Sequence, residues 1–313
     1  MGSLLDPTIL CFLIGLLAGF CKSDLKLPAS TYEFVSMYLL LAIGLKGGAE
    51  MAKTGFSAFL PAVGATLLLG ILVPVIAYMI LKASKKFSRE DSGAIAAHYG
   101  SVSAVTFATA ISFLEAQKVP YESYVTTLMV ILEIPAICVG IYLAKGGFNG
   151  VLSKRELACD VLFGKSLFLL GGGLVVGFVA DGQKMNDIEP LFVDLFKGFL
   201  AFFLLEMGVK ASQQMSCLRK TGVFLFGFAI VMPLISGMIG VLLGYLIGMS
   251  PGGVFILAIL AASSSYIAAP SAIKIAVPSA NPTLSLTSSL AITFPFNIVV
   301  GIPLFFMIIG KLF

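Results

Sequence analysis

The sequence contains little charge: only 12% of its 313 residues are Asp, Glu, Lys or Arg, whereas 58% are hydrophobic. A soluble domain with this balance could not bury its apolar surface within its own core. The composition therefore excludes a soluble fold and predicts an integral membrane protein. The net charge of +4 comes from short, scattered basic groups, so we expect no nucleic-acid-binding surface.

Residue types that enzymes need are also scarce. His98 is the only histidine, which excludes the zinc motif HExxH and leaves any serine triad dependent on this one residue. The five cysteines are dispersed and form no CxxC pair, which favours small buried side chains over a metal or redox site. The sequence has no P-loop. We therefore expect no enzyme, no transition-metal site and no cofactor, and transport would be driven by an ion gradient.

Apolar stretches of about 20 residues, the length of a membrane-spanning helix, fill most of the chain. Residues 1–6 carry no basic side chain, so we expect the first stretch to remain as a helix rather than to be cleaved as a signal peptide. The predicted fold is an all-α polytopic membrane protein with ten transmembrane helices. The spans are expected near residues 7–21, 31–45, 56–81, 92–114, 122–144, 160–180, 190–209, 223–248, 253–275 and 283–310.

Lysine and arginine are distributed unevenly between alternate loops. If the N-terminus lies outside, the cytoplasmic loops hold fourteen of them and the outer side holds five. Since basic residues are retained on the cytoplasmic side, this predicts that both termini lie outside. The expected location is a bacterial inner (plasma) membrane.

The two halves of the chain share motifs in the same order. Residues 15–20 align with 173–178, residues 43–46 with 207–210, and residues 101–103 with 263–265. Each half has an odd number of spans, so the halves would lie in opposite orientations. We expect a first five-helix repeat at residues 1–149, a cytoplasmic connection at 150–159 and a second, inverted repeat at 160–313.

Polar residues interrupt the fourth and ninth spans at matching places, at residues 100–106 (GSVSAVT) and 263–270 (SSSYIAAP). Broken backbone at membrane depth is tolerated where it lines a cavity or binds an ion. The hydroxyls of Ser103 and Ser265 are placed to cap half-helices that restart after each break. In an inverted pair, the positive N-termini of these half-helices would face each other and bind a small anion, and nearby oxygen atoms would suit sodium. The alternative is that the small residues only allow close helix packing.

Glu133 is an ionisable residue within the fifth span, where a functional role is the default expectation. We expect it to line the ion path, with a structural hydrogen bond as the alternative. Thr293 and Asn297 lie at or near the equivalent position in the second half. Asp194 and Lys197 are three residues apart and could pair on one helix face.

Three further side chains flank the interruptions and would line or gate the path: His98, Tyr99 and Tyr266. For His98, a proton relay or pH sensor is one interpretation. A packed, hydrogen-bonded histidine is the alternative.

Five motifs together resemble the sodium-dependent bicarbonate transporter family best known from cyanobacteria: residues 100–106, 133–136, 261–265, 278–282 and 301–304. The resemblance covers nearly the whole chain. It implies five-plus-five inverted repeats with crossing helices 4 and 9, a core domain and a gate domain, and a homotrimer. It also implies sodium as coupling ion and a PII-like cytoplasmic regulator as a partner.

The resemblance assigns residues to two sites where spans 4 and 9 cross. The anion would be held by Gly100, Ser101, Ser103, Ser264, Ser265 and Ala268. Sodium would be held by Ser103, Thr106, Ser263, Ser265 and Glu133.

Tyr266 stands where the family pattern has an aspartate, so one carboxylate is missing and sodium or protons could be the coupling ion. The expected function is secondary active uptake of bicarbonate with sodium by alternating access. The alternatives are symport of another small anion or carboxylate, and an anion sensor that acts through a cytoplasmic partner.

Overall fold

The computed structural model describes residues 6–52, 59–146, 164–180, 187–215 and 218–313. These residues form helices and loops and contain no β-strand. Six of the described helical stretches are long and apolar enough to cross a membrane. They are Ala29–Met51, Leu60–Ala83, Arg89–Gln117, Val125–Lys145, Gly222–Leu246 and Pro282–Ile309.

Each predicted span coincides with one helix or with consecutive helical segments. Their order is α1 (Pro7–Phe20), α2 (Ala29–Met51), α3 (Leu60–Ala83), α4 (Arg89–Gly100), α5 (Ala104–Gln117), α6 (Val125–Lys145), α8 (Lys165–Val179), η3 (Pro190–Asp194), α10 (Phe196–Met215), α11 (Leu218–Leu246), α12 (Pro251–Ala262), α13 (Ala268–Ala276), α14 (Pro282–Leu286), η4 (Thr287–Thr293), α15 (Phe294–Phe296), η5 (Asn297–Gly301) and α16 (Ile302–Ile309). The η segments are π-helical. The predicted connection at residues 150–159 lies outside the described residues.

The structure shows both predicted interruptions. The α4 helix ends at Gly100, and α5 begins at Ala104 after three non-helical residues. The α12 helix ends at Ala262, and α13 begins at Ala268 after five. The polar runs therefore mark the breaks in these two helices to within a residue or two.

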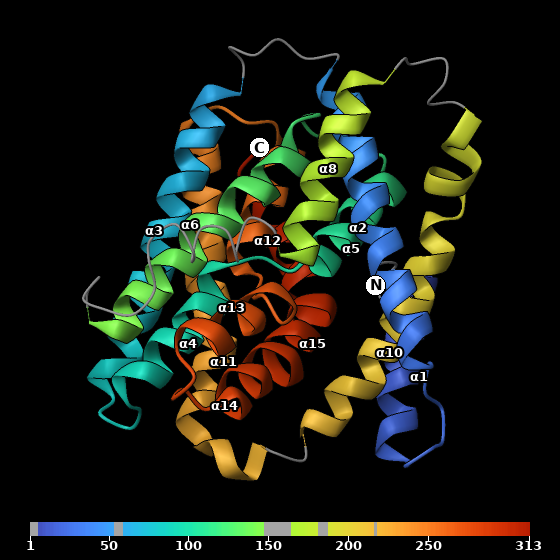
Figure 1. The fold of residues 1–313 in the computed structure, drawn as a ribbon. Helices are drawn as coiled ribbons and strands as arrows, with labels where there is room; N and C mark the ends of the chain where they lie inside the picture. The colour runs from blue at the N-terminus through green and yellow to red at the C-terminus, as the bar shows by residue number, and fades with distance from the viewer. Residues whose placement is uncertain (1–5, 53–58, 147–163, 181–186, 216–217) are drawn as a thin grey trace.

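The helices form two groups, which lie side by side in Figure 1. In the four-helix group, on the right of that view, α1 packs along α10, α2 packs along α8, and α2 also contacts α10. In the other group, which we call the crossing-helix group, α3, α4 and α6 pack on one another, and α11 packs on α12 and η4. The α5, α13, α14 and α16 segments contact α4 or α12 and belong to this second group.

Glycines bring the helices of the four-helix group into backbone contact, and the contacts occur in pairs. A methyl group on Gly15 would overlap the carbonyl oxygen of Leu205, and one on Gly173 would lie 3.0 Å from that of Leu41. Gly15 and Gly173 are aligned in the two halves, and so are Leu41 and Leu205 by the same register as residues 43–46 and 207–210. The α1–α10 interface is therefore repeated in α8–α2, with the two halves exchanged.

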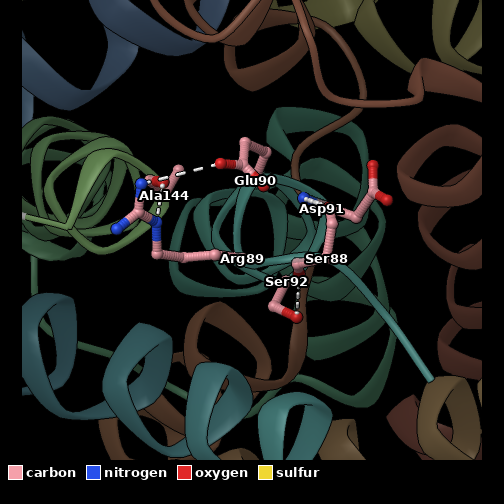
Figure 2. A network of polar contacts seen from close by, with 6 residues as sticks. All are labelled: Ser88, Arg89, Glu90, Asp91, Ser92 and Ala144. Carbon is pink, nitrogen blue, oxygen red and sulfur yellow. Dashed lines mark hydrogen bonds and ion pairs between the residues drawn. The ribbon is translucent and has the colours of Figure 1, made fainter. Parts of the chain in front are cut away.

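The outer ends of the interrupted helices are fixed by polar contacts. Figure 2 shows the start of α4, where the Ser88 hydroxyl accepts the Asp91 amide at 2.9 Å and the Arg89 Nε donates to the Ala144 carbonyl of α6 at 3.1 Å. The Asp91 carboxylate also accepts the amide of Asn281 at 2.7 Å, which ties the first half of the chain to the second.

A second contact of this kind holds the start of α12. The Glu122 carboxylate, in the loop between α5 and α6, accepts the amide of Ser250 at 2.6 Å and its hydroxyl at 3.0 Å. Ser250 in turn caps α12 through the amide of Gly253. Because both interrupted helices are held at their outer ends, their inner ends have defined positions.

Candidate functional site

Two serine hydroxyls cap the restarted half-helices. The Ser103 hydroxyl accepts the amide of Thr106 in α5 at 3.1 Å, and the Ser265 hydroxyl accepts the amide of Ala269 in α13 at 3.1 Å. Both bonds satisfy donors that the start of a helix leaves unpaired. The predicted capping role is confirmed for Ser103, which is the N-cap residue of α5; Ser265 binds a first-turn amide of α13 as predicted, but from two residues before the N-cap residue Ile267.

The two interruptions are hydrogen-bonded to each other. The Ser103 amide donates to the Ser263 hydroxyl at 3.1 Å, and the Ser265 amide donates to the His98 carbonyl at 2.8 Å. The Ser103 hydroxyl donates to the hydroxyl of Tyr266 at 3.1 Å. The non-helical segments therefore cross in contact, which brings the first turns of α5 and α13 close together.

A cavity lies at this crossing, which we call the central cavity; its empty space, including the part that is open to solvent, is about 350 Å³. It is lined by Leu40, Val102, Ser103, Ala104, Met129, Glu133, Ser166, Leu170, Ser265, Tyr266, Ile267 and Ala268. Ala104 and Ala268 are the first residues of α5 and α13, and neither amide has a hydrogen-bond partner among the described residues. Unpaired amides at two helix N-termini favour an anion in this cavity.

Glu133 also lines the central cavity. Its side chain is only 5% exposed, and no described residue forms a hydrogen bond or ion pair with it. A buried carboxylate without a partner is costly, and a bound cation would remove that cost. The hydroxyl oxygens of Ser103 and Tyr266 line the same cavity and are ligands of the kind that sodium prefers.

Other residues assigned to the two sites lie next to the cavity rather than on it. Gly100 packs against Pro74, where a methyl group would come within 2.7 Å of the ring. The Ser101 hydroxyl is fully buried without a partner. Ser263 donates to the Leu260 carbonyl at 2.8 Å, and Ser264 turns toward the Ser289 carbonyl at 3.5 Å. The Thr106 side chain is buried, and its amide is bound by the Ser103 hydroxyl.

Four residues predicted to line or gate the path are buried among the helices: Tyr99, Thr293, Asn297 and His98. The Tyr99 hydroxyl donates to Thr293 at 2.7 Å, because the Thr293 hydroxyl itself donates to the Ala229 carbonyl at 2.6 Å. The Asn297 amide nitrogen donates to the Ala262 carbonyl at 2.7 Å, at the end of α12, and its oxygen has no partner.

His98 is fully buried. Its Nδ1 lies 2.7 Å from the Ala94 carbonyl, so Nδ1 carries the proton, and Nε2 has no partner. This is the packed, hydrogen-bonded arrangement that was the alternative to a proton relay.

Several residues that line the central cavity carry no local sequence signal for that position. Leu40, Met129 and Leu170 come from α2, α6 and α8 and are ordinary apolar residues of those helices. Ser166 adds a hydroxyl from the first turn of α8. Among the lining residues that were not predicted, only Ala104 could have been anticipated, because its amide directly follows the capping Ser103.

Further cavities continue from the central cavity in two directions. The α13-side cavity, about 1100 Å³, shares Leu40, Ser166, Ile267 and Ala268 with it. A small cavity of about 250 Å³ shares Leu40, Ala104 and Ile267 with the central cavity, and Ser36 with the α13-side cavity. That small cavity shares Ile43 and Ala108 with the α5-side cavity of about 600 Å³. The crossing thus lies between two larger cavities near opposite ends of α2.

The apolar helices, the two interruptions and the cavity at their crossing define a multi-pass membrane protein of the transporter class. The model of the Na+-dependent bicarbonate transporter superfamily matches residues 7–310. The chain belongs to this superfamily. A comparison with curated proteins gives no match.

Proposed function

We propose that this protein is a secondary active transporter that takes up bicarbonate together with sodium by alternating access. The observation that carries the proposal is the central cavity. The unpaired amides of Ala104 and Ala268 favour an anion, and the unpartnered carboxyl group of Glu133 favours a cation. Each ion lowers the electrostatic cost of binding the other, which would couple their transport.

The proposed topology has ten crossings in two inverted five-helix repeats. The paired glycine contacts of α1–α10 and α8–α2 support it, because an exchange of the two halves reproduces them. The cross-links from Asp91 to Asn281 and from Glu122 to Ser250 support it as well, since each ties the start of an interrupted helix to the other half. The distribution of lysine and arginine between alternate loops supports a topology with both termini outside a bacterial inner membrane.

The two helix groups would provide the core and gate domains. The crossing-helix group carries the capped N-termini and Glu133, so it would be the core, and the four-helix group would be the gate. The α13-side and α5-side cavities lie on either side of the crossing and would be the two access routes. Sliding or rocking of one group against the other would open them in turn.

A second candidate is symport of another small anion or carboxylate with sodium or protons. Tyr266 supports this second candidate, because its neutral hydroxyl stands where the family pattern has an aspartate. Glu133 is then the only carboxyl group among the described residues that line the central cavity. A homotrimer and a PII-like cytoplasmic regulator remain predictions from the resemblance. An anion sensor acting through such a partner is the rival of a different class.

Uptake of labelled bicarbonate into liposomes that contain only this protein tests the proposal. We expect uptake that rises with an inward sodium gradient and falls when the gradient is abolished. Competition by unlabelled formate or acetate separates bicarbonate from carboxylate symport, and a proton gradient replaces sodium in a parallel arm. Absence of flux with every anion, despite anion binding, would favour the sensor.

A further inference from the structure

A charged triad joins the two helix groups beside the α5-side cavity. Glu115 lies near the end of α5, and one of its carboxylate oxygens forms an ion pair with the Nζ of Lys46 in α2 at 2.5 Å. Its other oxygen lies 3.6 Å from Lys197 of α10. These two ion pairs cross between the groups, whereas Lys165–Glu33 and Lys210–Glu206 lie within the four-helix group and Arg89–Glu90 lies within the crossing-helix group.

The geometry of this triad is that of a bound oxyanion. A carboxylate is a planar group with one negative charge shared by two oxygens, and here each oxygen faces its own ammonium group. Both ammonium groups belong to the four-helix group, whereas the carboxylate belongs to the crossing-helix group. If the groups move relative to each other, the lysines stay together and the carboxylate leaves.

The surrounding cavity supplies further donors. Ser112, a residue that is 4% exposed, lines it, and its buried hydroxyl has no hydrogen-bond partner among the described residues. Thr126 and Tyr121 line the cavity as well. Burial, and then the carboxylates of Glu50 and Glu115, raise the pKa of Tyr121, so its hydroxyl remains protonated. With Glu115 withdrawn, two lysines face one carboxylate, Glu50, and the lining carries a net positive charge.

We propose that Lys46 and Lys197 form a capture site for a small planar oxyanion, and that Glu115 occupies this site as an internal competitor in the present conformation. The proposal rests on the proposed function, because withdrawal of Glu115 is part of alternating access. An anion that takes the place of Glu115 would release the link between α5 and the four-helix group. Capture of the solute and opening of the α5 side would thereby be connected.

The first test measures sided transport of labelled bicarbonate in oriented vesicles. Lys46→Gln and Lys197→Gln should each raise the KM at the α5-side face by about two- to fivefold, the range for one partly exposed ion pair. The KM at the opposite face should not change. Glu115→Gln should lower the KM at the α5-side face. Lys118→Gln is the matched control, because this exposed lysine follows α5 at the same end and does not line the cavity.

The second test measures binding without transport. Purified protein is melted in sodium bicarbonate and in sodium chloride at equal ionic strength. Glu115→Gln should show a larger bicarbonate-dependent rise in Tm than the unmodified protein, and adding Lys46→Gln should remove the increase. Flux with unchanged sided KM values in all lysine variants would overturn the capture site. If the unmodified protein shows no flux but the expected Tm differences are found, the proposed function would be wrong and the capture site would still be supported.

Discussion

Replacing Glu133 with Gln tests the most consequential side chain of the central cavity. The change keeps the shape of the side chain and removes its ability to carry charge. Glu133 is 5% exposed and no described residue pairs with its carboxyl group, so a bound cation would be the main electrostatic partner of that group. We therefore expect the variant to transport with a much weaker dependence on sodium.

The size of the effect follows from the cost of the unpaired charge. An ionised carboxylate within a membrane span costs about 3 kcal/mol, and a cation in contact with it recovers part of that cost. Since 1.4 kcal/mol corresponds to a tenfold change in affinity, the sodium concentration for half-maximal uptake should rise by roughly tenfold to 100-fold. The hydroxyls of Ser103 and Tyr266 would remain as neutral ligands, so some sodium binding should persist.

The assay is initial uptake of labelled bicarbonate into liposomes over a range of external sodium, with the Tm in detergent as a check on folding. Glu133→Asp is the charge-retaining comparison and should keep more of the sodium dependence than Glu133→Gln. Glu90→Gln, at the outer end of α4, is the control for loss of a carboxylate away from the cavity. Identical sodium activation curves for Glu133→Gln and the unmodified protein would refute the reasoning and make Glu133 structural.

Three further changes test the fold around the site. Ser103→Ala removes a helix cap worth about 1 kcal/mol and should lower both the Tm and uptake, whereas Ser103→Thr keeps the hydroxyl and should retain more of each; equal uptake in the two variants would contradict a role for the hydroxyl. Gly44→Ala and Gly208→Ala would both press a methyl group into the backbone of the facing helix, so the two variants should lose similar amounts of Tm. If only one of the two variants kept its Tm, the two interfaces would not be equivalent. Glu122→Gln should cost about 1–2 kcal/mol by weakening two charge-assisted bonds to Ser250, seen as a lower Tm, and an unchanged Tm would show that the loop does not anchor α12.

The positions of the helices could be predicted largely from composition. Long apolar runs specify spans, and hydroxyl-rich gaps specify breaks because they offer the backbone alternatives to helical hydrogen bonds. The capping roles of Ser103 and Ser265 followed from the same local chemistry. These predictions succeeded because each depends on residues close together in the chain.

The lining of the cavity depends on tertiary contacts and could not be predicted in the same way. A run of three serines, residues 263–265, indicates a break but does not show which hydroxyl faces inward. The structure turns Ser265 to the central cavity and Ser264 toward the Ser289 carbonyl in η4. The rest of the lining comes largely from α2, α6 and α8, where Leu40, Met129 and Leu170 are apolar residues that no local pattern distinguishes from their neighbours.

The expected pairing of Asp194 with Lys197 was wrong for a physical reason. A three-residue spacing aligns side chains only on a continuous α-helix. Asp194 ends a π-helical turn and α10 begins at Phe196, so the register is broken between the two residues. Lys197 instead lies near Glu115 of α5, a contact that no local pattern contains.

The α5 and α13 ends of the structure differ, although the α1–α10 and α8–α2 interfaces repeat each other. Lys46 and Lys210 occupy aligned positions, yet Lys46 pairs with Glu115 of the crossing-helix group, whereas Lys210 lies 4.0 Å from Glu206 on its own helix. The α5 end is therefore tied across the groups, and the α13 end borders the larger cavity of about 1100 Å³. If the halves are inverted repeats, exchanging their conformations would break the ion pair between Lys46 and Glu115 and bring Lys210 toward the end of α13. That end offers helix carbonyls and the basic Lys274 in place of a carboxylate. The opposite state would then lack an equivalent ion pair, so the present conformation should be the more populated one without solute.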